Sequence, residues 1–288
     1  MEIRTILVAV SGGGASEGAV ETACRLARRF NSHLEGLHVA VEVHVPHWPI
    51  AGSSTRALKD AVSREGKDAA AAARRIFDAA VSRHGLPLLG RASGDGRSSA
   101  GCGASARWRE DSGLDTRAIA RRARLFDLIV LGRSSRAVRQ PSSATIERAL
   151  LEGGRPVLVA ESRALDRLGE TIALAWNDSP QAARALSAAL PFMKSASRTH
   201  ILCFGDASME ELIEQLRWYG VQASGHRFPP LAQQRAETGE LLLGATRDCQ
   251  ADLLAMGAYG HPPWWEALFG GATREVLRKD TLSILLAH

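Results

Sequence analysis

The sequence contains little cysteine and no cysteine motif. Only four of its 288 residues are cysteines, and they lie far apart with no CxxC pair: Cys24, Cys102, Cys203 and Cys249. This spacing is typical neither of a zinc-binding motif nor of a disulfide framework. Cys24 and Cys203 fall within apolar patterns, which indicates that they are small core residues.

Long hydrophobic runs are also missing. No apolar run approaches the roughly 18 residues that a membrane-spanning helix requires. The first ten residues, MEIRTILVAV, lack the cleavage-site pattern of a signal peptide, and their apolar run predicts a buried strand instead. We therefore expect a cytoplasmic protein.

Familiar catalytic and nucleic-acid-binding motifs are absent as well. The sequence has no nucleophile elbow, Walker A, HExxH or carboxylate-pair motif, and no residue stands out as a general base. It has no RNP-type, zinc-finger or clear helix-turn-helix pattern. The net charge is +5 and the pI is about 9.4, but the arginines are dispersed along predicted helix faces, which favours solvated surfaces over a nucleic-acid interface. The positive charge would still attract anionic nucleotides.

What the sequence does contain is a series of strands and helices that occurs twice. Apolar runs predict strands at 3–10, 34–45, 108–110, 127–132 and 156–160, and again at 172–176, 199–204, 221–226, 253–256 and 284–287. Amphipathic stretches between them predict helices. One is expected to begin at an N-cap Ser16, and another to have Ser179 as its N-cap and Pro180 as its first residue.

Short motifs support an internal repeat. The segment DLIVLG at 127–132 parallels DLLAMG at 252–257, and ILVAVS at 6–11 parallels IALAWN at 172–177. The polar segment 161–169 between the halves predicts a linker. We therefore expect two α/β domains, at residues 1–162 and 169–288.

A glycine-containing loop follows the predicted strand 253–256. It holds Gly257, Gly260, Gly270 and Gly271, and an amphipathic helix is predicted from Ala272. The loop therefore lies at the carboxyl end of a parallel strand, where open α/β sheets bind ligands. Glycines there allow backbone N–H groups to approach a phosphate, and the following helix N-terminus favours negative charge.

The spacing G-x2-G-x9-G that starts at Gly257 resembles the universal stress protein (UspA-like) family, whose ATP-binding members carry G-x2-G-x9-G-(S/T) at this place. Asp252 at the head of the strand and His261 after the second glycine also fit the resemblance. Gly271 departs from it, because a hydroxyl residue that contacts phosphate is expected there, although Thr273 is nearby.

The tandem layout resembles the two-domain members of this family. That resemblance implies two Rossmann-like domains, each a five-stranded parallel sheet flanked by helices, packed as an intramolecular pseudo-dimer. It implies a stress-response regulatory protein that binds ATP, or alternatively ADP or AMP, with a divalent metal such as Mg²⁺ and at most slow ATPase activity. A homodimer and an unidentified protein partner are further expectations. The residues expected at the nucleotide are Ala175, Asn177, Cys203, Phe204, Met256, Gly257, Gly260, His261, Gly270, Gly271, Ala272 and Thr273.

Two of these residues carry open alternatives. Asn177 stands where the family has an acidic residue that helps to hold the adenosine. Its amide can hydrogen-bond the adenosine, or it can cap the turn beside Asp178. His261 can touch a phosphate or cap the loop.

The first half lacks the glycine pattern. Ser135 replaces the second glycine, Ser143 replaces the distal one, and the loop between them is two residues shorter. Side chains at these positions obstruct a cradle of converging N–H groups, although Arg133 and its serine neighbours can attract some anion. We expect this half to be a structural scaffold that does not bind ATP.

Two other functions are compatible with the sequence. One is a scaffold or interaction protein of the same fold that binds no nucleotide. The other is a metal-binding protein, since His38, Glu42 and His44 share one face of the second predicted strand and His47 follows in the loop. The simpler interpretation of that cluster is the exposed end of a strand.

Overall fold

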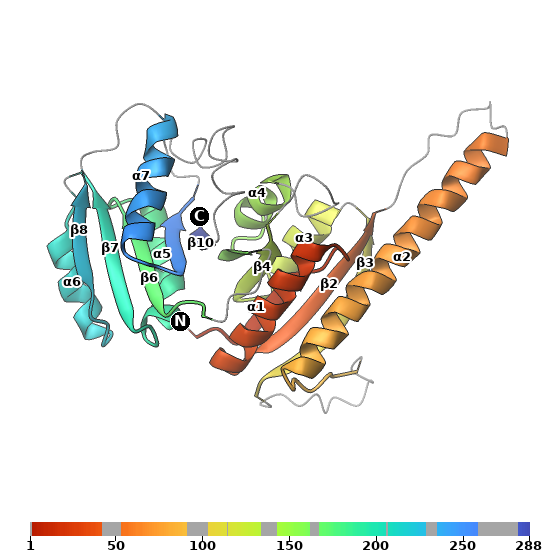
Figure 1. Cartoon of the computed structure of the whole chain (residues 1–288), viewed down its shortest axis with the longest axis horizontal. Coiled ribbons are helices and arrows are strands. Elements are labelled where there is room, and N and C mark those ends of the chain that lie inside the picture. The colour runs from red at the N-terminus through yellow and green to blue at the C-terminus, as the bar shows by residue number, and fades with distance from the viewer. Residues whose placement is uncertain are drawn as a thin grey trace.

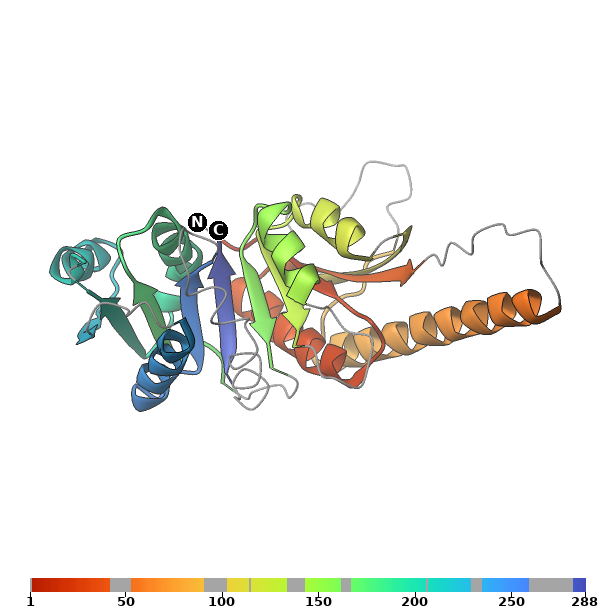
Figure 2. The same ribbon diagram turned by 90° about the horizontal axis from the view of Figure 1, so that it is seen from above.

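The computed structural model of the chain describes residues 2–41, 53–90, 103–113, 115–133, 143–161, 167–205, 207–228, 235–258 and 282–288. The strands within these residues form one 10-stranded sheet with the order β3-β2-β1-β4-β5-β10-β9-β6-β7-β8 (Figures 1 and 2). No helix in this described part is long and apolar enough to cross a membrane.

The first half alternates strands and helices as the sequence predicts. Its elements are β1 (Thr5–Ala9), α1 (Gly14–Phe30), β2 (His33–Val41), α2 (Ser53–Arg83), β3 (Ser105–Gly113), α3 (Asp115–Ala123), β4 (Leu128–Gly132), α4 (Ser143–Leu151) and β5 (Val157–Ala160). Helix α2 has 31 residues and extends well beyond the edge of the sheet (Figure 1).

The second half repeats this series with a much shorter second helix. Its elements are β6 (Thr171–Trp176), α5 (Pro180–Met193), β7 (Arg198–Phe204), α6 (Met209–Trp218), β8 (Ser224–Phe228), α7 (Arg235–Asp248), β9 (Leu253–Gly257) and β10 (Ser283–Ala287). Ser179 caps α5 by accepting a hydrogen bond from the Ala182 N–H, and Pro180 opens the helix, both as predicted.

The two halves have the same topology and meet edge to edge. Numbered within its half, each set of five strands has the order 3-2-1-4-5, and all its pairs are parallel. The halves join through β5 and β10, which are antiparallel, with Ile284 opposite Val159. The predicted α/β fold and the pseudo-dimeric arrangement of its two parallel sheets are confirmed.

The core lies on both faces of the sheet. Alternate residues of each strand point to opposite faces, so Ile6 and Val8 join one cluster while Leu7 and Ala9 join the other. The first core cluster lies under α1, α2, α5 and α6, and the second core cluster lies under α3, α4 and α7. Burial on both faces explains why the central strands are nearly continuous apolar runs.

One carboxylate in each half ties the fourth strand to the first. Asp127 accepts hydrogen bonds from the backbone N–H of Arg4 and Thr5, each at 2.9 Å, and from the Thr5 hydroxyl. Asp252 accepts hydrogen bonds from the backbone N–H groups of Gly169 at 2.6 Å and of the next two residues. The aspartates of the DLIVLG and DLLAMG motifs are therefore structural equivalents.

Helices of the two halves also contact each other. The rings of Phe30 on α1 and Phe192 on α5 meet edge to face, with centroids 5.0 Å apart. Beside them, the Arg29 guanidinium donates hydrogen bonds to the carbonyl groups of Leu168 and Gly169, where the chain enters the second half. Sheet pairing and helix packing thus bring the halves together at the same boundary.

Several local predictions need correction. Ser16 is not an N-cap: α1 begins at Gly14, and the Ser16 hydroxyl inside its first turn accepts a hydrogen bond from the Ser11 N–H. The strand predicted at 108–110 spans Ser105–Gly113, because it pairs along the whole length of β2. The strand predicted at 221–226 begins only at Ser224, where its pairing with β7 starts.

Candidate functional site

Three strands of the second half end at one edge of the sheet. The strand order places β6 between β7 and β9, so the connections that follow β6 and β9 flank the point where the order reverses. Such a point is the usual ligand crevice of an open α/β sheet. Ala175, Cys203, Met256 and Gly257 all lie at or next to these strand ends, so the structure brings these predicted residues together.

The side chains of two predicted residues point away from this edge into the protein. Met256 is fully buried in the second core cluster, and Ala175 packs against the same cluster. The Met256 side chain is therefore not available to a ligand. The backbone of Phe204 forms the last position of β7, opposite Phe228 of β8.

The loop after β6 is held by its own polar side chains. Asn177 accepts hydrogen bonds through Oδ1 from the Ser179 hydroxyl at 2.7 Å and from the Ser179 N–H at 3.3 Å. Of the two roles that the sequence left open for Asn177, the structure shows the turn cap. Its amide nitrogen also carries two donor hydrogens.

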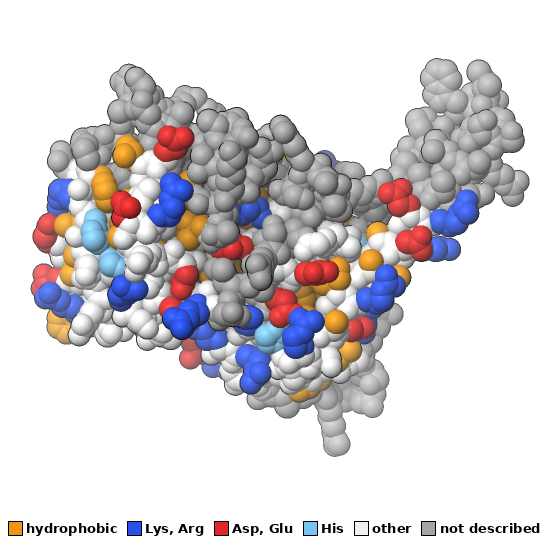
Figure 3. Space-filling model, in the orientation of Figure 1, with side chains coloured by type: hydrophobic (Ala, Val, Ile, Leu, Met, Phe, Trp, Pro, Cys, Tyr) orange, Lys and Arg blue, Asp and Glu red, His pale blue; other side chains and the backbone are white. Residues whose placement is uncertain are grey.

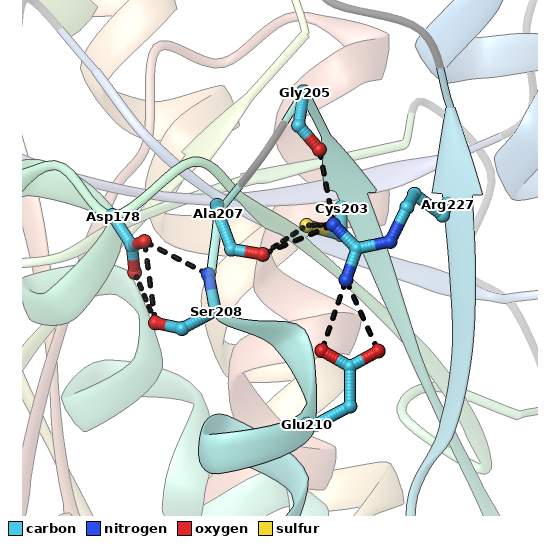
Figure 4. A network of polar contacts seen from close by, with 7 residues as sticks. All are labelled: Asp178, Cys203, Gly205, Ala207, Ser208, Glu210 and Arg227. Atoms are coloured by element: carbon cyan, nitrogen blue, oxygen red, sulfur yellow. Dashed lines mark hydrogen bonds and ion pairs between the residues drawn. The ribbon is translucent and has the colours of Figure 1, made fainter.

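Asp178 links this loop to the start of α6. Its backbone has a left-handed conformation with φ of 56°, and its carboxylate accepts a 2.9 Å hydrogen bond from the Ser208 N–H (Figure 4). Sequence reasoning gave Asp178 no role beyond its place in the turn. A carboxylate at a helix start is a common signal, but its partner lies 30 residues along the chain.

The end of β7 is occupied by an arginine from β8 (Figure 4). The Arg227 guanidinium donates hydrogen bonds to the carbonyl groups of Gly205 at 3.1 Å and Ala207 at 3.2 Å, and pairs with both oxygens of Glu210. A backbone hydrogen bond and the bonds from Arg227 lower the pKa of the Glu210 carboxyl. Buried Cys203 lies beside this network, and its thiol donates to the Ala207 carbonyl at 3.4 Å.

Gly257 is a glycine because β9 ends against α5. A Cβ atom there would lie 2.6 Å from the carbonyl carbon of Gln181 and 2.7 Å from the nitrogen of Ala182. Both are backbone atoms of the first turn of α5, so a larger residue would push the helix away. The first glycine of the motif therefore brings the start of the loop next to a helix N-terminus.

The rest of the predicted phosphate loop lies outside the described residues. This applies to Gly260, His261, Gly270, Gly271, Ala272 and Thr273.

Trp176 lies at the candidate site, and sequence reasoning gave it no role there. Its indole packs against the first core cluster at the end of β6, and its Nε1 is buried with no hydrogen-bond acceptor among the described residues. A buried indole N–H usually has a partner. The internal repeat held a signal for it, because Trp176 stands where the first half has the much smaller Val10.

Comparison with known proteins identifies the family. A model of the universal stress protein family matches residues 2–160, more than half of the chain. The chain belongs to the universal stress protein family. Comparison with curated proteins finds no match.

Solved structures agree with the fold of this universal stress protein. A universal stress protein from Archaeoglobus fulgidus DSM 4304 aligns with a TM-score of 0.67 at 14% identity, covering 99% of this chain and 96% of that one. A functionally unknown protein from Pseudomonas aeruginosa PAO1 aligns with a TM-score of 0.51 at 16% identity, covering 99% and 92%. At these identities the likeness shows the tandem fold alone.

At the equivalent edge of the first half, three described residues contact other parts of the protein. Gly12 has a φ of +85°, and a Cβ atom there would lie 2.6 Å from the Ala69 carbonyl oxygen of α2. The Val10 carbonyl accepts a 2.8 Å hydrogen bond from Nδ1 of buried His38. Arg133, in the degenerate loop, donates to the Leu282 carbonyl of the other half.

Other first-half residues with predicted roles are only partly visible. Ser134 and Ser135 lie outside the described residues, and so do Glu42, His44 and His47. Of the predicted histidine cluster, the structure thus describes only His38, whose ring donates a hydrogen bond to the Val10 carbonyl.

Proposed function

We propose that this universal stress protein is a stress-response regulator that binds ATP, or the related ADP or AMP, in a C-terminal domain at residues 169–288. The N-terminal domain at 1–162 acts as its scaffold. The observation that carries the proposal is the close approach of Gly257 to the first turn of α5 at the reversal point of the strand order. A phosphate-binding loop that starts there lies beside a helix N-terminus, which favours negative charge.

The described residues suit an adenine nucleotide in two further ways. Trp176 offers a buried indole N–H without an acceptor in the described part of the chain, next to the loop expected to hold the adenosine. Asn177 keeps its amide donors at the exposed end of the same strand. Mg²⁺ would accompany the phosphates and be held mainly by them and by water.

The test is ATP titration of the purified chain, freed of bound nucleotide, by calorimetry. Gly260→Glu should weaken binding on the order of 100-fold, about 2.7 kcal/mol, because it adds bulk and negative charge to the phosphate loop. Ser135→Glu, at the matched position of the first half, should leave binding unchanged. Binding that is equally lost in both variants, or absent in the unmodified chain at millimolar ATP, would refute the proposal.

A second variant tests the adenosine end of the site. Trp176→Phe keeps an aromatic ring in the first core cluster but removes the indole N–H. We expect ATP affinity to fall roughly fivefold to tenfold, the effect of losing one hydrogen bond of about 1 kcal/mol. Unchanged affinity would show that the indole contributes only packing.

The competing function is a scaffold that binds partners without nucleotide. It is favoured by the turn-capping bonds of Asn177 and by the packing role of Gly257, since both explain these residues without a ligand. Strands β3 and β8 are the two ends of the described sheet and could pair with a second copy or a partner. A chain that binds no ATP but sediments as a dimer would support this alternative.

A further inference from the structure

Two histidines and a cysteine converge at the outer part of the second half. They are His200 on β7, His226 on β8 and Cys249 directly after α7, and each can offer one ligand atom within 4.8 Å of the others. This cluster is separate from the strand ends that form the candidate nucleotide site.

The strand register places both imidazoles on one face of the sheet. His226 lies opposite Leu202, two residues after His200, so the two histidines are diagonal neighbours. Leu202 points into the second core cluster, and the histidines therefore face the side of the sheet that α7 covers. Figure 3 shows histidine side chains reaching the surface over β7 and β8, so an ion can enter from solvent.

The cysteine is held by a well-defined helix end. Gln250 has a left-handed φ of 53°, its N–H donates to the Arg247 carbonyl, and the Ala251 N–H donates to the Thr246 carbonyl. These two bonds define a Schellman motif, in which Cys249 is the capping residue. Two of the candidate ligands thus stand on strands, and the third stands at a helix C-cap of defined geometry.

The distances suit a tetrahedral ion. Nδ1 of His200 and Nε2 of His226 are 3.0 Å apart, and that same Nε2 lies 3.7 Å from the Cys249 sulfur. Zinc bonds of about 2.0–2.1 Å to nitrogen and 2.3 Å to sulfur predict separations of roughly 3.3 Å and 3.6 Å between tetrahedral ligands. Small side-chain rotations would bring the three atoms to these values.

The three candidate ligand atoms contact one another directly. Nδ1 of His200 and Nε2 of His226 share one hydrogen bond, and the Cys249 sulfur lies within hydrogen-bonding distance of the same Nε2, so these are the atoms that an ion would separate and bind. Burial, the neighbouring His226 and Arg198 lower the pKa of His200.

We propose that His200, His226 and Cys249 form a zinc-binding site, with a fourth position open to water. Two imidazoles and a thiolate are ligands that Zn²⁺ accepts readily. Burial and Asp248 raise the pKa of the Cys249 thiol, so binding replaces its proton with the sulfur–zinc bond and releases that proton to water. The ion would join the end of α7 to the two outermost strands of the second half.

The test uses the full chain without a histidine tag, stripped with a chelator and titrated with zinc under reducing conditions. We expect one zinc ion per chain. Cys249→Ser, which loses the thiolate, should bind zinc at least 100-fold more weakly, beyond the 10–100-fold typical of residues that only support a metal ligand. Cys24→Ala, which removes a buried cysteine of the first half, should bind normally.

A spectroscopic and a thermal readout keep the test independent of folding defects. The cobalt-loaded chain should show a thiolate-to-metal charge-transfer band that is missing in Cys249→Ser, and zinc should raise the thermal midpoint of the unmodified chain but not of His226→Ala. Zinc binding that survives in Cys249→Ser but is lost in His44→Ala would overturn the proposal and point to the histidine cluster of the first half. Absence of stoichiometric binding to the unmodified chain would overturn it as well.

Discussion

The same place in the fold holds different chemistry in the two halves. The register of β1 with β2 pairs Ile6 with Leu34, and that of β6 with β7 pairs Ile172 with Thr199, so His200 occupies the position of Glu35. In the first half this position carries a buried ion pair, whereas in the second half it carries a candidate metal ligand.

The equivalence extends to the surroundings. Arg109 stands opposite Leu37 as His226 stands opposite Leu202. Alignment of the two structural aspartates places Cys249 at the position of Arg124. The second half thus has two histidines and a cysteine where the first half has a glutamate and two arginines. The backbone frame is shared, whereas the polar side chains on this face differ between the halves.

The largest loss of stability is expected from a substitution at Arg122. The Glu35 carboxylate is buried, and it accepts hydrogen bonds of 2.6 and 2.7 Å from the Arg122 guanidinium, whose pKa this bond raises. Arg122→Ala leaves that carboxylate without its cation and should cost about 3 kcal/mol, the low end for a broken buried pair because Arg122 is partly exposed. Urea unfolding monitored by circular dichroism measures this loss.

Arg121 supplies the matched control for this prediction. Its guanidinium is 73% exposed and pairs with Asp111 at 3.3 Å. Arg121→Ala should change the free energy of unfolding by about 0.5 kcal/mol or less, because exposed pairs contribute little. Equal losses of unfolding free energy in the two arginine variants would show that the burial of Glu35 adds nothing to the strength of its ion pair.

The next largest effect is expected at the two structural aspartates and tests their equivalence. Asp127 and Asp252 each accept three hydrogen bonds from the start of the first strand of their half. Replacement of either by alanine removes the acceptor of all three hydrogen bonds and leaves the backbone N–H groups without this partner. Each variant should lose about 2 kcal/mol of unfolding free energy. The exposed Asp68 gives a control, since Asp68→Ala should be nearly neutral, and a loss in only one half would contradict the equivalence.

The repeat and the sheet were predictable because their signals are local. The pair DLIVLG and DLLAMG fixed the fourth strand of each half, and Ser179 with Pro180 marked the start of α5 correctly. Ser16 misled, since the glycine turn before it allows α1 to start earlier without a side-chain cap. An edge strand such as β8 has few apolar residues, so its true start was invisible to periodicity.

The sites were less predictable because their residues meet only through strand pairing. Glu35 and Arg122 are 87 residues apart in the sequence, and nothing local indicates their pairing. The spacing of the cysteines argued against a zinc motif, and that argument holds only for ligands that are near in sequence. Cys249 became a candidate ligand once β7, β8 and the end of α7 were placed side by side.

The smallest predicted effect is the pH dependence of stability that His200 adds to the second half. Because burial lowers the pKa of His200 below the ordinary value near 6.5, the folded chain keeps this ring neutral while the unfolded chain takes up a proton. Stability from this group is therefore complete above about pH 6.5 and is lost as pH falls from there through the lower folded pKa.

In the presence of chelator, urea midpoints at pH 7.5 and 5.5 should differ less in His200→Gln than in the unmodified chain. His33→Gln should also reduce this pH difference, because burial lowers the pKa of His33 in the first half. Zinc binding should abolish the contribution of His200 and leave that of His33 unchanged. An unaltered pH difference in His200→Gln would mean that this histidine is already free to protonate in the folded protein.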